Sequence, residues 1–274
     1  MLRKLMKHEF RATGRVMLPV LGILLATSVA ANVSLRHLLD SNAWFLSMLG
    51  ILLMAAFGIA IVGVFIVAYI LMIQRFYKNL LQDEGYVMLT LPVSIHQHIW
   101  SKLIVSSVWF IVTILAVILA GCVVAFDIRF INALFAGLGE LFQELRNLQA
   151  YYAINGTAIV IELIVLAFLG LVAMCLQFYA ALAAGHSLPS HKMAWSVVWY
   201  FGLQFALQIL GVSAIRLLDQ LNFFDWGIFY PELHLDVMAG IHIGLSMMIF
   251  LTVAYGAIFY GITTFFLKKR LNLE

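Results

Sequence analysis

The chain alternates between long apolar runs and short clusters of charge. Six windows of 20 or more residues contain no Asp, Glu, Lys or Arg: 16–35, 41–74, 103–126, 163–191, 193–215 and 237–267. A helix crosses the roughly 30 Å hydrocarbon core of a bilayer in about 20 residues, so each window is long enough to span it. A shorter charge-free window, 85–101, contains Pro92, Ser94 and two histidines, and we do not expect it to span. The pattern predicts spans at about 16–35, 44–73, 103–126, 157–184, 194–216 and 238–267.

Composition supports the same interpretation. Hydrophobic residues make up 64% of the chain and charged residues 11%, with a mean hydropathy of +1.04. Soluble domains carry about 25% charged residues. We therefore expect an all-α polytopic membrane protein in which residues 1–274 form a single transmembrane domain.

The distribution of basic residues predicts the orientation. Six spans place both termini on one side, and 12 of the 16 Lys and Arg residues lie on that side. The composition points to a bacterial cell membrane, and because Lys and Arg mark the cytoplasmic ends of spans, both termini are expected in the cytoplasm. The net charge of +3 reflects this bias, and a nucleic-acid partner is not expected.

Three segments outside the spans have amphipathic or interfacial character. Residues 1–15 predict an interfacial helix on anionic headgroups, with a bend at Thr13-Gly14 into the first span; a solvated basic tail is the alternative. The outer connection 127–156 contains a helical pattern over 130–148 that would lie on the outer surface or against the spans. The outer connection 217–237 mixes aromatic and acidic residues, which suits a membrane interface.

The segment 80–102 lies between the second and third spans, on the predicted cytoplasmic side. Asp83 and Glu84 favour the start of a short helix, because carboxylates are stabilised near a helix N-terminus. Pro92 ends the apolar run that follows. Ser94, with Gln97 three residues later, predicts a capping box that opens a helix continuing into the third span. A partly apolar helix at this surface suggests a partner.

This segment, DEGYVMLTLPVSIHQHIWSKL, resembles the coupling segment of ATP-binding-cassette transporter permeases of the type-2 exporter superfamily. The family pattern has an acidic residue and Gly, a short helix, a Leu-Pro pair, a Ser or Thr cap and a Lys entering the third span. The positions that match are Glu84, Gly85, Leu91, Pro92, Ser94 and Lys102. The chain departs from the family in its connection between spans three and four, which is about 30 residues long where a short one is expected.

The resemblance implies that the segment docks on a separate ATPase subunit and couples ATP hydrolysis to substrate movement. The implied contact residues are Asp83, Glu84, Gly85, Tyr86, Leu89, Leu91, Pro92 and Ser94. A loop that packs only on its own spans is the alternative. The resemblance also implies a second permease copy or paralogue as dimer partner. Spans two and five would form that interface or line a translocation path through Gly58, Gly63, Gln204, Gln208 and Gly211.

Catalytic and metal-binding motifs are missing from the sequence. It has no G-x-x-x-x-G-K-[ST], H-E-x-x-H, C-x-x-C or G-x-S-x-G. We therefore expect no enzyme activity, catalytic residue, metal or cofactor on this chain, and expect ATP and Mg on the partner ATPase. Cys122 and Cys175 are predicted at different membrane depths, too far apart for a disulfide.

Glu162 and His242 lie within predicted spans. Glu162 either snorkels to the outer surface or serves a substrate or counter-ion, and His242 is expected to bond a neighbouring helix. Neither identifies a substrate. The alternative function is a non-transporting membrane protein, of binding or immunity type, that captures a ligand with its outer helices.

Overall fold

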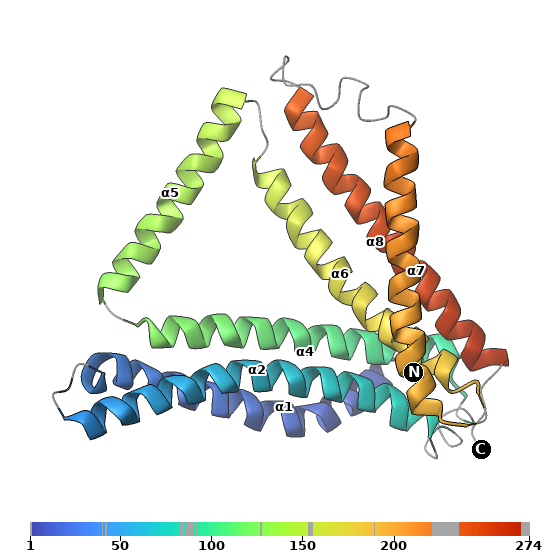
Figure 1. The fold of residues 1–274 in the computed structure, drawn as a ribbon, viewed down its shortest axis with the longest axis horizontal. Coiled ribbons are helices and arrows are strands. Elements are labelled where there is room, and N and C mark those ends of the chain that lie inside the picture. The colour runs from blue at the N-terminus through green and yellow to red at the C-terminus, as the bar shows by residue number, and fades with distance from the viewer. Residues whose placement is uncertain are drawn as a thin grey trace. The chain divides into compact units, whose positions relative to one another are not determined.

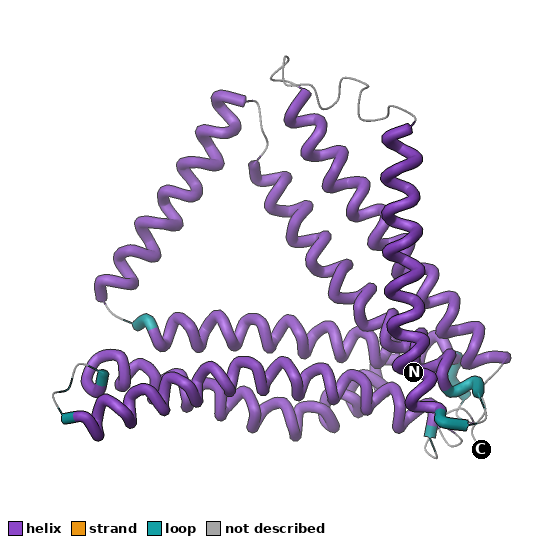
Figure 2. Tube along the Cα trace, in the orientation of Figure 1, coloured by secondary structure: helices purple, strands orange, loops and turns teal. Residues whose placement is uncertain are grey.

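The computed structural model describes residues 2–39, 41, 43–82, 85, 90, 92–126, 128–152, 156–188, 190–220 and 236–269. In these ranges the regular structure is entirely helical (Figures 1 and 2). The elements are α1 (Leu2–Val33), the π-helical turn η1 (Ser34–Leu38), α2 (Trp44–Leu81), α4 (Ile95–Val124), α5 (Ile128–Tyr152), α6 (Gly156–Gly185), α7 (Lys192–Gln220) and α8 (Asp236–Lys269).

Six stretches of the described residues are long and apolar enough to cross a membrane. They are Leu2–Leu38, Trp44–Leu81, Ile95–Val124, Gly156–Gly185, Lys192–Ser213 and Ile241–Lys269. These stretches confirm the six predicted spans and the all-α polytopic fold. Most run beyond the predicted bounds, because the polar residues that flank an apolar run remain in the same helix.

The chain divides into two compact units, and each is described by itself. Unit 1 comprises the residues up to Ala136, and unit 2 begins at Gly137. In unit 1, α1, α2 and α4 run alongside one another (Figure 1). Its apolar core is built from Leu21 and Leu24 of α1, Val64 of α2 and Ala120 of α4. The three helices therefore share one interior.

The N-terminal segment is continuous with the first span. The predicted bend at Thr13-Gly14 is wrong, because α1 is helical from Leu2 to Val33. Thr13 Oγ1 donates to the Glu9 carbonyl at 2.8 Å and accepts from Trp109 Nε1 of α4 at 2.7 Å. A Cβ on Gly14 would lie 3.5 Å from the Trp109 ring. Thr13 and Gly14 thus form a contact with α4, within an unbroken helix.

At the opposite end of unit 1, side chains from the end of α1 and from η1 bond the neighbouring helices. Asn32 Nδ2 donates to the carbonyls of Val123 and Val124, at 3.0 and 2.9 Å, and the Arg36 guanidinium donates to the Phe126 carbonyl. The last carbonyls of a helix have no partner within the helix, so these donors cap α4. Ser34 Oγ in η1 also donates to the Gly50 carbonyl of α2 at 2.7 Å.

In unit 2, α6 packs against both α7 and α8. Phe178 of α6 stacks on Tyr200 of α7 with ring centroids 4.7 Å apart. A tight turn joins α6 to α7, and a Cβ on Gly185 would lie well under 3.0 Å from the backbone of Ser196. Gly185 therefore lets the start of α7 approach the end of α6.

Helix α5 contains the predicted 130–148 helix and extends it at both ends. Its described side chains are exposed, including those of the apolar positions Phe135, Leu138, Leu141 and Phe142. Many apolar side chains of the spans are exposed as well, for example Ile59 of α2 and Phe250 of α8. A bilayer would remove such surfaces from water.

Candidate functional site

The candidate site is the connection from the end of α2 at Leu81 to the start of α4 at Ile95. The Gly85 N–H donates to the Gln82 carbonyl at 2.7 Å, and Gly85 is buried. Pro92 and Ser94 are exposed. Five of the eight predicted contact residues lie outside the described residues: Asp83, Glu84, Tyr86, Leu89 and Leu91.

Ser94 is the N-cap of α4, as predicted. Its backbone is extended (φ −69°, ψ 148°), and its side chain accepts from the Gln97 N–H at 3.3 Å. A capping hydroxyl satisfies one of the four free N–H groups at a helix start. The sequence pattern therefore located the point at which the connection becomes the third span.

Both ends of the connection lead directly to a buried polar cluster, which we call the Glu9 cluster: Glu9 of α1, Asn79 of α2 and Lys102 of α4. Glu9 Oε1 accepts from Lys102 Nζ at 2.6 Å and from Asn79 Nδ2 at 3.1 Å. All three residues are buried, and the Lys102 side chain is only 2% exposed. One carboxylate oxygen thus joins all three helices of unit 1.

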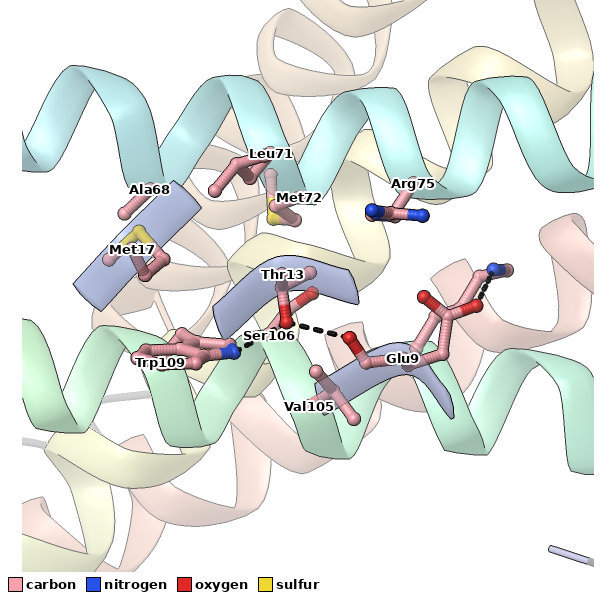
Figure 3. A pocket seen from close by; sticks show the side chains of 11 residues that line it. Glu9, Thr13, Met17, Ala68, Leu71, Met72, Arg75, Val105, Ser106 and Trp109 are labelled. Atoms are coloured by element: carbon pink, nitrogen blue, oxygen red, sulfur yellow. Dashed lines mark hydrogen bonds and ion pairs between the residues drawn. The ribbon is translucent and has the colours of Figure 1, made fainter. Parts of the chain in front are cut away.

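The cluster borders a small pocket between the same helices (Figure 3). Thr13 and Trp109 line it on the side of the apolar core, and Arg75 of α2 lines it beside Glu9. Its cavity is about 20 Å³, close to the room that a single water molecule needs. The pocket is lined by both polar and apolar side chains and is too small for an organic substrate.

Sequence reasoning noted Lys102 but missed Glu9 and Asn79. Glu9 is the only acidic residue among the first 15, in a segment that carries five basic residues. The position of Glu9 among basic residues could have indicated its role, because a single carboxylate on a basic helix suggests a specific cationic partner. The spacing of 93 residues between Glu9 and Lys102 gave no local cue to the partner.

The glycines predicted at a dimer interface or translocation path lie on open helix surface. Gly58 and Gly63 line a shallow apolar groove of about 420 Å³ on α2, together with Ala55, Ile59, Val62 and Ile66. A Cβ at Gly58, Gly63 or Gly211 would meet nothing within 4 Å among the described residues. These surfaces leave room for a partner.

The two predicted glutamines of α7 differ in their surroundings. Gln204 accepts from Gln177 Nε2 of α6 at 2.8 Å, so it bonds a helix of its own unit. Gln208 lines a shallow groove of about 330 Å³ on α7 that also includes Ser213 and Arg216. Gln177 was not singled out in the sequence, because its partner lies 27 residues away across a turn.

Glu162 and His242 were considered separately and are partners in the structure. His242 Nδ1 of α8 lies 2.9 and 3.0 Å from the two carboxylate oxygens of Glu162 in α6. The prediction that His242 bonds a neighbouring helix is confirmed. The pair lies away from the α2–α4 connection in the sequence and belongs to unit 2.

The turn between α6 and α7 contains a buried histidine. His186 Nδ1 donates to the Leu182 carbonyl at 2.8 Å, and Ser196 Oγ lies 3.4 Å from the same nitrogen. Burial lowers the pKa of His186 below 6.5, the Leu182 hydrogen bond opposes that shift, and the charge of Lys192 adds to it. The neutral imidazole is therefore favoured in this turn.

Among the described residues no group of three His, Cys, Asp or Glu side chains could hold a metal ion. Cys122 and Cys175 are both free thiols. Comparison of the chain with protein-family models, with curated proteins and with solved structures finds no match.

Proposed function

We propose that this chain is the membrane-spanning permease subunit of an ATP-driven exporter of the ATP-binding-cassette type. A separate ATPase subunit would bind ATP and Mg and would contact the α2–α4 connection. The chain itself would carry no enzyme activity and would work with a second permease copy or paralogue. The observation that carries the proposal is the attachment of this connection to the Glu9 cluster.

A coupling element must be fastened to the helices that it moves. Asn79 lies three residues before the connection begins at Gln82, and Lys102 lies eight residues after Ser94. Both side chains hold the same Glu9 carboxylate. Displacement of the connection would therefore pull on α1 as well as on α2 and α4. The apolar core around Leu24, Val64 and Ala120 would pass that displacement further along the three helices.

The exposed residues of the connection agree with a docking role. Pro92 and Ser94 are exposed although Leu80, Leu81 and Ile99 on either side are buried. Among the described residues of the connection Gly85 is buried, so the exposed surface that a partner could contact includes Pro92 and Ser94. The groove beside Gly58 and Gly63 in α2 suits the close approach of a second helix, as small residues do in membrane proteins.

Photo-crosslinking tests this proposal. A photoreactive amino acid replaces Pro92, and the matched control places it at Gln74, an exposed position of α2. The proposal predicts that the Pro92 position captures a P-loop ATPase in native membranes and that the Gln74 position does not. Equal capture at both positions, or capture of lipid alone at both, would contradict it.

One observation favours a second candidate function. The apolar positions Phe135, Leu138 and Phe142 of α5 are exposed, so this helix could present a surface to a ligand. Under that alternative the chain binds a ligand with its outer helices and transports nothing, and the α2–α4 connection is dispensable. The depth of α5 in the membrane separates the two candidates.

A further inference from the structure

The second oxygen of the Glu9 carboxylate, Oε2, is not bonded by Asn79 or Lys102. Both of those side chains bond Oε1, and within the described residues Oε2 accepts no hydrogen bond. The Glu9 side chain is 10% exposed, so bulk water reaches little of it. An ionised carboxylate has about four acceptor sites, and leaving them unused in a buried position is costly. A donor for Oε2 is therefore expected inside unit 1.

Arg75 of α2 carries such donors. It is half-buried and lines the same pocket as Glu9, and Figure 3 shows its guanidinium beside the Glu9 carboxylate. Within the part of the chain that the structure describes, Arg75 makes no hydrogen bond and no ion pair. A guanidinium has only donors, and all of them need acceptors once water is partly removed. Arg75 and Oε2 therefore complement each other without a direct bond.

The cavity lined by these two groups has the size and the polarity of a hydration site. Its volume of about 20 Å³ exceeds the roughly 10–15 Å³ that one water molecule occupies. A buried water also needs two to four polar partners. Oε2 of Glu9 offers an acceptor, Arg75 offers donors, and the Ser106 hydroxyl lies on the same lining. One water molecule therefore has both room and partners here.

Helical spacing explains why the cavity lies next to the Glu9 cluster. Arg75 lies four residues before Asn79 on α2, and Ser106 lies four residues after Lys102 on α4. Residues four apart share one face of a helix. The side chains that line the cavity therefore lie one turn away from those that bond Oε1.

We propose that this cavity binds one water molecule, which accepts a hydrogen bond from Arg75 and donates one to Oε2 of Glu9. A bridging water contributes nearly as much as a direct hydrogen bond. The site adds a second residue of α2 to the Glu9 cluster and a second positive charge beside the carboxylate, in addition to that of Lys102. It does not depend on the proposed transport function.

Radiolytic footprinting of the full chain in lipid nanodiscs tests for the water. X-rays generate hydroxyl radicals from water held inside a protein, and these radicals oxidise the side chains beside it. Met17 and Met72 line the cavity and are only 0% and 2% exposed, so radicals formed in bulk solvent do not reach them. We expect both methionines to be oxidised in the wild type.

A variant that fills the cavity locates the source of the radicals. Ala68 also lines the cavity, so Ala68→Val should exclude the water and abolish oxidation of Met17 and Met72. Lys78→Leu, at an exposed position of α2, is the control and should leave their oxidation unchanged. The proposal is overturned if both methionines stay unoxidised in the wild type, or if their oxidation persists in Ala68→Val.

Thermal unfolding tests the link between Arg75 and Glu9. Arg75→Leu should lower the unfolding temperature of the wild type clearly more than that of Glu9→Leu/Lys102→Met, because the double variant has no carboxylate for the water to bond. Lys78→Leu should have the same small effect in both backgrounds. An equal effect of Arg75→Leu in the two backgrounds would contradict the water bridge.

Discussion

At the scale of single residues, Glu9 determines how the helices of unit 1 meet. Its carboxylate lies between Asn79 and Lys102, and all three side chains are buried. A buried ion pair gains attraction in a medium of low dielectric constant but loses the hydration of both charges. Removal of one partner therefore destabilises the folded protein more than removal of both partners does. This asymmetry gives the Glu9 cluster a distinctive mutational signature.

We expect Lys102→Met to destabilise the protein by about 3–5 kcal/mol, because it leaves the Glu9 carboxylate buried without its cation. The double variant Glu9→Leu/Lys102→Met should recover most of that loss. Thermal unfolding in mild detergent measures both. Lys7→Met, at an exposed position of α1, is the control and should have little effect. If Lys102→Met loses no more thermal stability than Lys7→Met, the ion pair between Lys102 and Glu9 does not stabilise unit 1 as expected.

Gly185 provides a residue-scale prediction in unit 2. A methyl group there would collide with the backbone of Ser196, so Gly185→Ala should separate the end of α6 from the start of α7. We expect a clear fall in thermal stability. Gly170→Ala, in the same helix but with nothing within 4 Å of the added methyl, should be tolerated. Equal stability of the two variants would show that the turn does not need this close approach.

At the scale of elements, the sequence predicted helices better than it predicted their ends and contacts. The charge-free windows located all six spans, because burial in lipid demands long apolar helices. The Ser94 cap was also predicted, since capping depends on local sequence. The bend at Thr13-Gly14 was wrong, because α1 is continuous there and both residues contact Trp109, which lies 96 residues away from Thr13. Gln177, Asn79 and Glu9 were missed for the same reason.

Helix α5 leads to the element-scale prediction. The two-faced pattern favours a helix on the membrane surface with Phe142 toward lipid and Glu140 toward water. In a background without Cys122 and Cys175, an environment-sensitive dye at Phe142→Cys should be quenched by nitroxide lipids, and the dye at Glu140→Cys should be quenched much less. Weak quenching at both positions would place α5 away from lipid and favour the ligand-binding alternative.

At the scale of the whole molecule, the division into two units matters for the proposed function. The α2–α4 connection and the Glu9 cluster belong to unit 1, and the Glu162–His242 pair belongs to unit 2. A force applied to the connection would act first on α1, α2 and α4. The sequence could predict the number of apolar helices long enough to span a membrane, and the cytoplasmic orientation of the termini stays a prediction from charge. It could not predict this division, because the division depends on helix contacts between distant residues.

The central claim is that a separate ATPase contacts the α2–α4 connection. Its most direct measurement is a mild-detergent purification of the tagged chain from its native cell, with mass spectrometry of the proteins that accompany it. The account predicts a stoichiometric P-loop ATPase that is lost when residues 83–94 are scrambled and retained in Lys7→Met. Recovery of the chain without an ATPase, under conditions that preserve a known transporter complex, would contradict the account.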